Sequence, residues 1–167
     1  VVQKYYKNIM VECVVRGYLW GSLAEEYENG IRNIYGIEMP EGLLRYEKIS
    51  EPLFTPTTKA DDHDAPMTYE EVEKKLGKVL ANKVRDTSIA LYKRGAELAL
   101  EKGLIFIDTK FEFGLDKKGE IYLIDEANTP DSSRYCTVEE YQKFEEIKSQ
   151  SGNYKDVSDL LKDNPLL

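Results

Sequence analysis

The stretch that decides the fold is Ile105-Phe106-Ile107-Asp108-Thr109-Lys110-Phe111-Glu112-Phe113-Gly114. It alternates with a period of two, which is the period of a β-strand. The alternation divides the side chains into a charged face, with Asp108, Lys110 and Glu112, and an apolar face, with Ile107, Phe111 and Phe113. Acid, base and acid in a row beside an apolar flank favour a functional site. The alternative is a half-exposed strand with surface salt bridges.

A β-hairpin is predicted to follow this strand. Asp116-Lys117-Lys118-Gly119 has the composition of a turn, and the run from Glu120 to Glu126 can form the return strand. If Leu115 pairs with Glu120, the expected pairs are Lys110 with Asp125, Phe111 with Ile124 and Phe113 with Tyr122. Glu112 then lies diagonal to Asp125, at roughly 7–8 Å. Because two carboxylates at that spacing can share one Mg²⁺, Glu112 and Asp125 are the predicted metal ligands, although a slip of one residue would reverse the faces.

Composition limits the classes of function. The 167 residues include 31 acidic and 23 basic ones, and the net charge of −8 argues against a general binder of nucleic-acid backbones while leaving a small anionic substrate open. Cys13 and Cys136 give neither a disulfide framework nor the spacing of a metal site, which suits a reducing cytoplasm. We see no run of roughly 18–20 apolar residues that could span a membrane, and no signal peptide. The chain is interpreted as one domain or one lobe of a larger protein.

Other elements are expected from local patterns. A strand is predicted over 9–16, a short helix over 23–27, largely irregular chain over 31–67, where four prolines occur, and helices over 69–77, 78–102, 138–148 and 157–162. The helices at 69 and 138 each begin with a capping box, Thr68-Tyr69-Glu70-Glu71 and Thr137-Val138-Glu139-Glu140.

Three further segments carry polar groups suited to anions. Arg16 and Ser22 flank a glycine-containing turn, Thr129-Pro130-Asp131-Ser132-Ser133-Arg134 follows the predicted hairpin, and Thr57-Thr58-Lys59 leads into an acidic loop with Asp64 and the single histidine, His63. Taken alone, each segment can also be an ordinary turn or a solvated loop, and for the turn at Arg16 to Ser22 and for His63 this structural reading is favoured. From the residues alone, the prediction is Mg²⁺-dependent handling of a phosphorylated anion.

Taken together, these motifs resemble those of the SAICAR synthetase family. The resemblance rests on Val11-Glu12-Cys13-Val14-Val15-Arg16 with Gly21-Ser22, on Glu51-Pro52-Leu53-Phe54-Thr55-Pro56-Thr57-Thr58-Lys59, on Asp108 to Gly114, on Asp125-Glu126 and on Thr129 to Arg134, in that order. It spans roughly residues 8–136. The fold it implies is α+β, an ATP-grasp-like lobe with a mainly antiparallel sheet flanked by helices.

The resemblance implies a ligase of purine biosynthesis that joins L-aspartate to carboxyaminoimidazole ribonucleotide (CAIR) with ATP and Mg²⁺, through an acyl phosphate. It implies Glu112 and Asp125 as ligands of Mg²⁺ and nucleotide, and Asn8 and Ile9 near the adenine. It implies Lys110 and Asp108 as catalytic residues. For the substrates it implies Arg16, Ser22, Asp108, Lys110, Ser132, Ser133 and Arg134 around CAIR, and Lys59 and Asp64 around aspartate.

The same resemblance implies that residues 1–167 form a partial synthetase domain, the larger lobe, without the glycine-rich, lysine-bearing ATP loop of the family. The expected partners are small molecules, with no nucleic acid or membrane, and homo-oligomer formation is left open. Two rival hypotheses remain. One is a non-catalytic fragment or degenerate paralogue that only binds the ribonucleotide, and the other is a different phosphotransferase on a kinase-related architecture.

Overall fold

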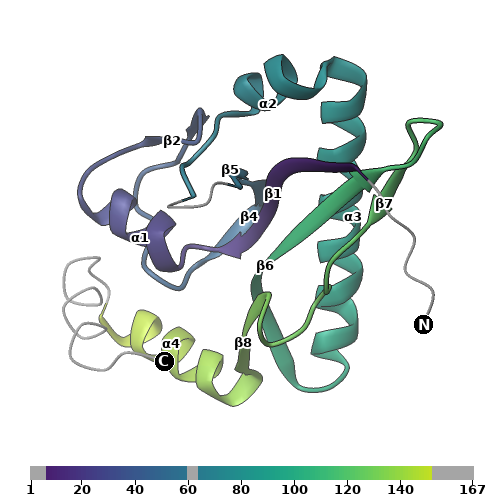
Figure 1. Cartoon of the computed structure of the whole chain (residues 1–167). Coiled ribbons are helices and arrows are strands. Elements are labelled where there is room, and N and C mark those ends of the chain that lie inside the picture. Colours follow the sequence, from purple (N-terminus) through teal and green to yellow (C-terminus); the bar gives the residue numbers. More distant parts are fainter. Residues whose placement is uncertain (1–6, 60–63, 152–167) are drawn as a thin grey trace.

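Two long antiparallel strands form the centre of the structure. The computed structural model of the chain describes residues 7–59 and 64–151, and its central strands are β1 (Lys7–Tyr18) and β6 (Leu104–Leu115), shown in Figure 1. Their register pairs Cys13 with Phe111 and Arg16 with Asp108, with an irregularity between Asn8 and Glu12. The start of β1 therefore lies beside the end of β6, and paired residues such as Arg16 and Asp108 are 92 positions apart in the sequence.

The remaining strands extend this pair into one antiparallel sheet. Its order is β4-β1-β6-β7, with β5 also pairing with β1 and β8 with β6. The bounds are β4 (Lys48–Phe54), β5 (Thr57–Thr58), β7 (Ile121–Leu123) and β8 (Ser133–Thr137), and a separate small hairpin holds β2 (Asn33–Ile34) and β3 (Ile37–Glu38). This arrangement of antiparallel strands and helices confirms the predicted α+β class.

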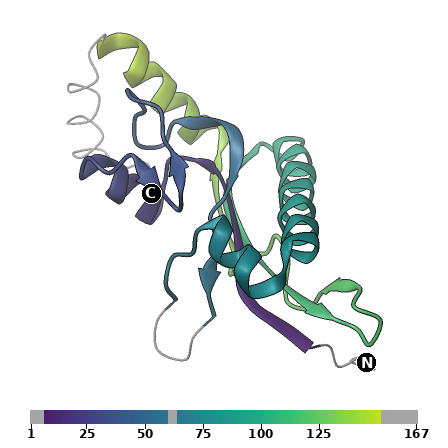
Figure 2. The same ribbon diagram turned by 90° about the horizontal axis from the view of Figure 1, so that it is seen from above.

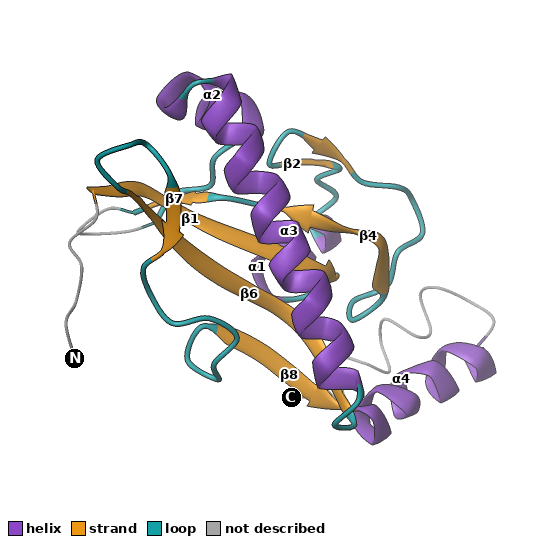
Figure 3. Ribbon diagram, turned by 90° about the vertical axis from the view of Figure 1, so that its right-hand side faces the viewer, coloured by secondary structure: helices purple, strands orange, loops and turns teal. Residues whose placement is uncertain are grey.

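One face of the sheet is covered by α3 (Lys78–Leu100), which crosses β1 and β6 obliquely in Figure 3. The preceding helix, α2 (Tyr69–Leu76), begins with the predicted capping box at Thr68 and ends at Gly77, where φ is +81°. Alternate residues of the two long strands, among them Val11, Cys13, Val15, Phe111 and Phe113, pack under α3 with Val84 and Tyr92. The main apolar core is thus the layer between the sheet and this helix.

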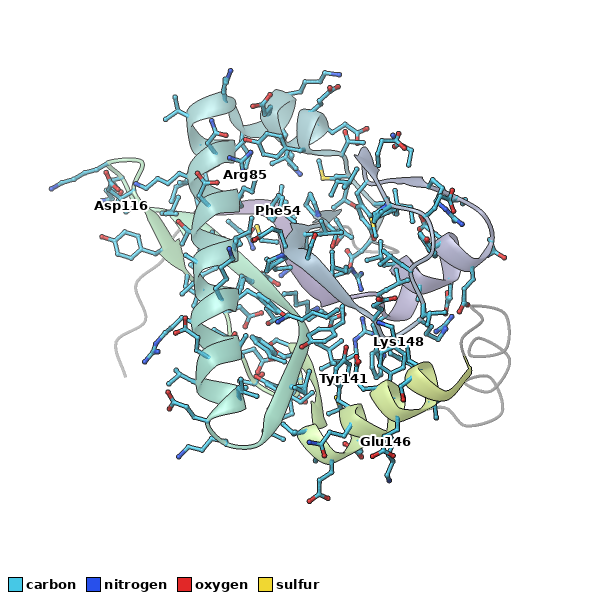
Figure 4. All side chains as sticks on the ribbon, turned by 180° about the vertical axis from the view of Figure 1, so that it is seen from behind. Phe54, Arg85, Asp116, Tyr141, Glu146 and Lys148 are labelled. Carbon is cyan, nitrogen blue, oxygen red and sulfur yellow. The ribbon has the colours of Figure 1, made fainter. Side chains whose placement is uncertain are left out.

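Among residues 7–59 and 64–151, helices cover the opposite face at one end only. Figure 2 shows α1 (Gly21–Glu28) and α4 (Val138–Ser151) on the side of the sheet away from α3. In Figure 4, Tyr141 points from α4 toward the body while Glu146 points away, and the Tyr141 ring lies edge-on to Tyr18 at 5.3 Å between centroids. The rest of this face carries the charged residues of β1 and β6.

The region 31–67 is more regular than its prolines predicted. β4 is a full strand despite Pro52, because it lies at the outer edge of the sheet order and, among the described strands, pairs only with β1. A missing N–H on its free side therefore breaks no ladder bond. The other predicted elements are present within a few residues of their expected ends. The predicted helix at 157–162 and His63 lie outside the described residues.

The predicted register of the hairpin was wrong by one residue. Leu115 pairs with Ile121 rather than Glu120, and Phe113 pairs with Leu123 rather than Tyr122. The reason is the turn, because Asp116 belongs to the closing pair, with its N–H donating to the Glu120 carbonyl at 3.0 Å, and the loop is only residues 117–119 with Gly119 at φ +80°. β7 ends at Leu123, so the expected strand pairs of Lys110 with Asp125 and of Phe111 with Ile124 do not form.

The expected place of Ile107 was also wrong. The register of β6 against β8 shifts between Phe106 and Asp108, which marks a β-bulge. As a result Phe106 joins Phe111 and Phe113 under α3, whereas Ile107 packs on the other side with Tyr18 and Phe144.

A helix that spans a membrane must be both long and apolar. No helix within 7–59 and 64–151 is long and apolar enough to cross a membrane.

Candidate active site

The charged residues of the two central strands lie on the face of the sheet that α3 leaves open. Asp108 and Glu112 are only 5% and 6% exposed, and Glu12 and Arg16 of β1 are similarly buried. The predicted alternation of Asp108, Lys110 and Glu112 against Phe111 and Phe113 is therefore confirmed. Buried charges need partners, and the partners define two neighbouring clusters.

The first cluster is Asp108 between two arginines. Arg16 Nη1 donates to Asp108 Oδ2 at 3.1 Å, and Arg134 Nε donates to Asp108 Oδ1 at 2.9 Å. Arg134 Nη2 also contacts Oδ2. The Arg16 side chain is 8% exposed, while that of Arg134 is 45% exposed. Arg134 is thus the accessible cation of the cluster, and the excess positive charge suits an anionic ligand.

Hydroxyl groups fix this first cluster. Arg16 Nε donates to Thr55 Oγ1 at 3.1 Å and Arg16 Nη2 to Ser22 Oγ at 3.3 Å. Ser133 Oγ lies 2.8 Å from Thr109 Oγ1, and Ser132 Oγ closes the loop by hydrogen bonds with Thr129. The serines thereby hold the loop that presents Arg134.

A cavity of about 280 Å³ opens beside this cluster. The cavity is lined by charged residues of β1 and β6 and by the loop and strand that carry the serines, among them Arg16, Asp108, Lys110, Ser132, Ser133 and Arg134. Two other cavities, of about 380 and 940 Å³, are lined in part by α3 and are more apolar. We assign the chemistry to the smaller cavity because the buried charges converge there.

The second cluster is a pair of carboxylates, each with its own lysine. Glu12 and Glu112 are direct partners across β1 and β6. Lys110 Nζ donates to Glu12 Oε1 at 3.2 Å, and Lys59 Nζ contacts both oxygens of Glu112. Thr57 and Asn8 add hydrogen bonds to Glu12 and Glu112, each of 3.3 Å. Two adjacent buried carboxylates are a set of hard oxygen donors that a divalent cation prefers.

Electrostatics place Asp64 with this second cluster. Partial burial lowers the pKa of Lys110, but the hydrogen bond to Glu12 and the charges of Glu12, Asp64 and Glu112 outweigh it, so the pKa of Lys110 is raised overall. Lys110 therefore stays charged at neutral pH, and Asp64 lies close enough to contribute.

Most predicted site residues are thus brought together, with Asp125 as the exception. Asp125 is exposed and follows Ile124, whose N–H donates to the Glu112 carbonyl at 3.1 Å. Its backbone runs beside Glu112, but within the described ranges no three acidic, histidine or cysteine side chains gather as a metal cluster.

Three residues were missed by the analysis of single motifs. Glu12 could have been found, because it shares a strand face with Arg16, but its pairing with Glu112 depends on a contact distant in sequence. Thr55, fully buried, gave no signal beyond its loop. Gly21 lies against Arg134, since a Cβ there would be 2.5 Å from Nη1.

Comparisons with known proteins identify a family that the chain resembles. The family model of SAICAR synthetase matches residues 1–158. The chain is 56% identical over 133 residues to the phosphoribosylaminoimidazole-succinocarboxamide synthase of Corynebacterium efficiens, a match covering 78% of this chain and 43% of that protein. It is 49% identical over 145 residues to the synthase of Mannheimia succiniciproducens, covering 86% of this chain and 50% of that protein.

A solved structure of the same family has a similar fold. The SAICAR synthase from Saccharomyces cerevisiae complexed with SAICAR superimposes with a TM-score of 0.74 at 34% identity, covering 97% of this chain and 52% of that chain. The chain spans about half the length of these relatives. The family model and the identities confirm the resemblance seen in the motifs, and the chain belongs to the SAICAR synthetase family.

Proposed function

We propose that the polypeptide containing this chain is an ATP-dependent ligase that joins L-aspartate to the carboxylate of CAIR and yields SAICAR, ADP and phosphate. Membership of the family supports this, as does the SAICAR named in the complex of the Saccharomyces cerevisiae relative. The observation that carries the proposal is the cavity beside Asp108, where the half-exposed Arg134 and Lys110 offer two cations to one small anion.

The chemistry requires activation of a carboxylate, which is a poor acceptor for an amine. A carboxylate oxygen of CAIR attacks the γ-phosphorus of ATP, and the bond from that phosphorus to the bridging oxygen of ADP breaks. The neutral amine of aspartate then attacks the acyl carbon, the bond to phosphate breaks, and the nitrogen releases a proton. Such transfers depend on positioning and on neutralising charge.

The first cluster and Lys110, which line the cavity of about 280 Å³, are assigned to CAIR. Arg134 and Lys110 neutralise its anionic groups and the developing acyl phosphate, and Asp108 holds Arg134 and Arg16 in place. Ser22, Ser132 and Ser133 support the phosphate side of the pocket. Lys59 and Asp64 are assigned to aspartate, because they present a cation and an anion beside the second cluster.

The second cluster fits a magnesium ion. Mg²⁺ is usually held by one or two carboxylates together with substrate phosphates and water, and the buried pair of Glu12 and Glu112 meets that need. We assign Glu112 and Asp125 to Mg²⁺ and nucleotide, with Glu12 beside them. When bound, the ion neutralises phosphate charge during transfer.

One assay separates the ligase from a non-catalytic ribonucleotide-binding protein. ATP, Mg²⁺, CAIR and L-aspartate are supplied to the 167-residue chain and to a longer polypeptide that adds the rest of the family's length. We expect SAICAR from the longer polypeptide. In that polypeptide, Arg134→Ala should weaken the binding of CAIR more than the binding of ATP. Absence of turnover from both would overturn the ligase assignment, and CAIR binding without turnover would support the non-catalytic alternative.

A further inference from the structure

We propose that Tyr92 is a positioning residue for the pair of Asp108 and Arg16, acting through the sheet from the face opposite the site. The Tyr92 hydroxyl donates to the backbone carbonyl of Phe106 at 2.6 Å and lies 3.4 Å from that of Ile107. The side chain is 3% exposed. The hydroxyl therefore binds β6 at the two residues that immediately precede Asp108. That this pair serves a ribonucleotide rests on the proposed function.

The backbone at this point is irregular, and the irregularity determines which way Asp108 faces. The register against β8 shifts between Phe106 and Asp108. Without a bulge Phe106 would share the charged face of Asp108, Lys110 and Glu112, since these residues have even spacing. With the bulge, its ring packs under α3. A bulge leaves a backbone group outside the ladder, and the hydroxyl of Tyr92 satisfies such a group.

The neighbouring strand is shaped to admit the same hydroxyl. Gly17 follows Arg16 directly, and a Cβ built on Gly17 would lie 1.9 Å from the Tyr92 hydroxyl oxygen. The register of β1 against β4 also shifts between Arg16 and Tyr18. Gly17 is required for space rather than for an unusual φ. The hydroxyl thus lies between the two strands at the level where Arg16 pairs with Asp108.

The Tyr92 side chain is held by a ring contact and by its hydroxyl. The ring is stacked on Phe106 with centroids 4.9 Å apart. The hydroxyl donates to the Phe106 carbonyl at 2.6 Å. The hydrogen bond is therefore the part of this contact that Tyr92→Phe removes, while the stacked ring remains.

The test compares Tyr92→Phe with Tyr69→Phe in the 167-residue chain. Both remove one hydroxyl from a hydrogen bond, and Tyr69, bonded to Asn82 between α2 and α3, lies away from the site. The first measurement is the ¹H–¹⁵N spectrum of the arginine Nε groups, because Arg16 Nε and Arg134 Nε are both donors in the first cluster. We expect their signals to shift in Tyr92→Phe and not in Tyr69→Phe.

The second measurement is the affinity for SAICAR. We expect Tyr92→Phe to weaken it by about fivefold, the effect of one hydrogen bond, while Tyr69→Phe leaves it unchanged. Gly17→Ala should weaken it further, and adding Tyr92→Phe to Gly17→Ala should restore part of the loss, because the oxygen nearest the new Cβ is removed. Unshifted arginine signals in Tyr92→Phe would overturn the proposal. If the unaltered chain bound no SAICAR, the assignment of the ribonucleotide pocket to this chain would fail, while the spectra would still decide the role of Tyr92.

Discussion

Glu12 and Glu112 face each other directly across β1 and β6, and both are more than nine-tenths buried. Two carboxylates in this position repel each other, and the repulsion rises as water is excluded. Each is offset by one lysine that reaches it from a half-exposed position, Lys110 for Glu12 and Lys59 for Glu112. The charges of Glu12 and Glu112 are therefore offset by two lysine side chains that reach solvent and are not themselves buried.

Lys59→Met should tighten the binding of a divalent cation. Lys59 contacts both carboxylate oxygens of Glu112, so it must move before a metal ion can bind there. Its side chain is 38% exposed, and the loss of such a pair corresponds to about 1 kcal/mol, or about fivefold in affinity. Titration with Mn²⁺, followed by electron paramagnetic resonance, measures the change.

Two controls accompany this variant. Lys83→Met removes an exposed ion pair with Glu120 and should leave Mn²⁺ affinity unchanged. Glu112→Gln should abolish the binding while leaving the fold intact. Weaker Mn²⁺ binding in Lys59→Met than in the unaltered chain would show that Lys59 assists the metal rather than competing with it.

Arg16→Ala should cost more stability than Arg134→Ala, although both side chains bind Asp108. The Arg16 side chain is 8% exposed and also donates to Thr55, so its loss leaves buried acceptors short of donors, at roughly 2–3 kcal/mol. Arg134 is 45% exposed, and its loss should cost about 1 kcal/mol or less. Urea unfolding of both variants measures the difference. Equal losses would contradict the distinction between a structural and an accessible arginine.

Gly21→Ala should disturb the site through Arg134. Gly21 has φ +57°, and its Cβ would lie 2.5 Å from Arg134 Nη1 and 2.8 Å from Nη2. The positive φ alone should cost roughly 1–3 kcal/mol. The matched control is Gly30→Ala, with φ +87° and no atom within 4 Å of the new Cβ. Both variants should lose stability, but only Gly21→Ala should weaken SAICAR binding; an equal effect on binding would remove Gly21 from the site.

The charged face could be predicted from the sequence because strand alternation is a local property. Asp108, Lys110 and Glu112 follow it, and the helix positions follow equally local capping boxes at Thr68 and Thr137. The pairing of Glu12 with Glu112 could not be predicted in this way, because it depends on which strands meet across a long separation in sequence.

The two wrong predictions, the hairpin register and the face of Ile107, share a physical cause. In each, a side chain hydrogen-bonds to the backbone where the strand pairing shifts by one residue. Asp116 accepts hydrogen bonds from the N–H groups of Lys118 and Glu120, which shortens the loop and shifts the hairpin register. At the other end of β6, the hydroxyl of Tyr92 supports the bulge that moves Ile107 to the opposite face. Neither contact leaves a periodic signal in the sequence.

The buried thiol of Cys13 should make the fold sensitive to alkaline pH. Burial raises the pKa of Cys13 from 9.0 to about 12, and burial raises that of Cys136 to about 11. Below pH 9 these thiols are protonated in the folded and the unfolded chain alike, so their contribution to stability is fully present. Above pH 9 the unfolded chain loses protons that the folded chain keeps, so stability falls as pH rises toward the folded pKa values.

The slope of this decline identifies Cys13. One proton of difference corresponds to about 1.4 kcal/mol per pH unit. Cys13→Ala should therefore show a shallower fall in the free energy of unfolding between pH 9 and 10 than the unaltered chain, whatever its starting stability. The double variant with Cys136→Ala should be flatter still. Burial also raises the pKa of Tyr18, from 10.0 to about 12. Because the unfolded value is 10.0, the loss of stability due to Tyr18 falls mainly above pH 10. An unchanged slope in Cys13→Ala would mean that the thiol ionises as readily in the folded chain as in the unfolded one, and that the layer between the sheet and α3 admits water.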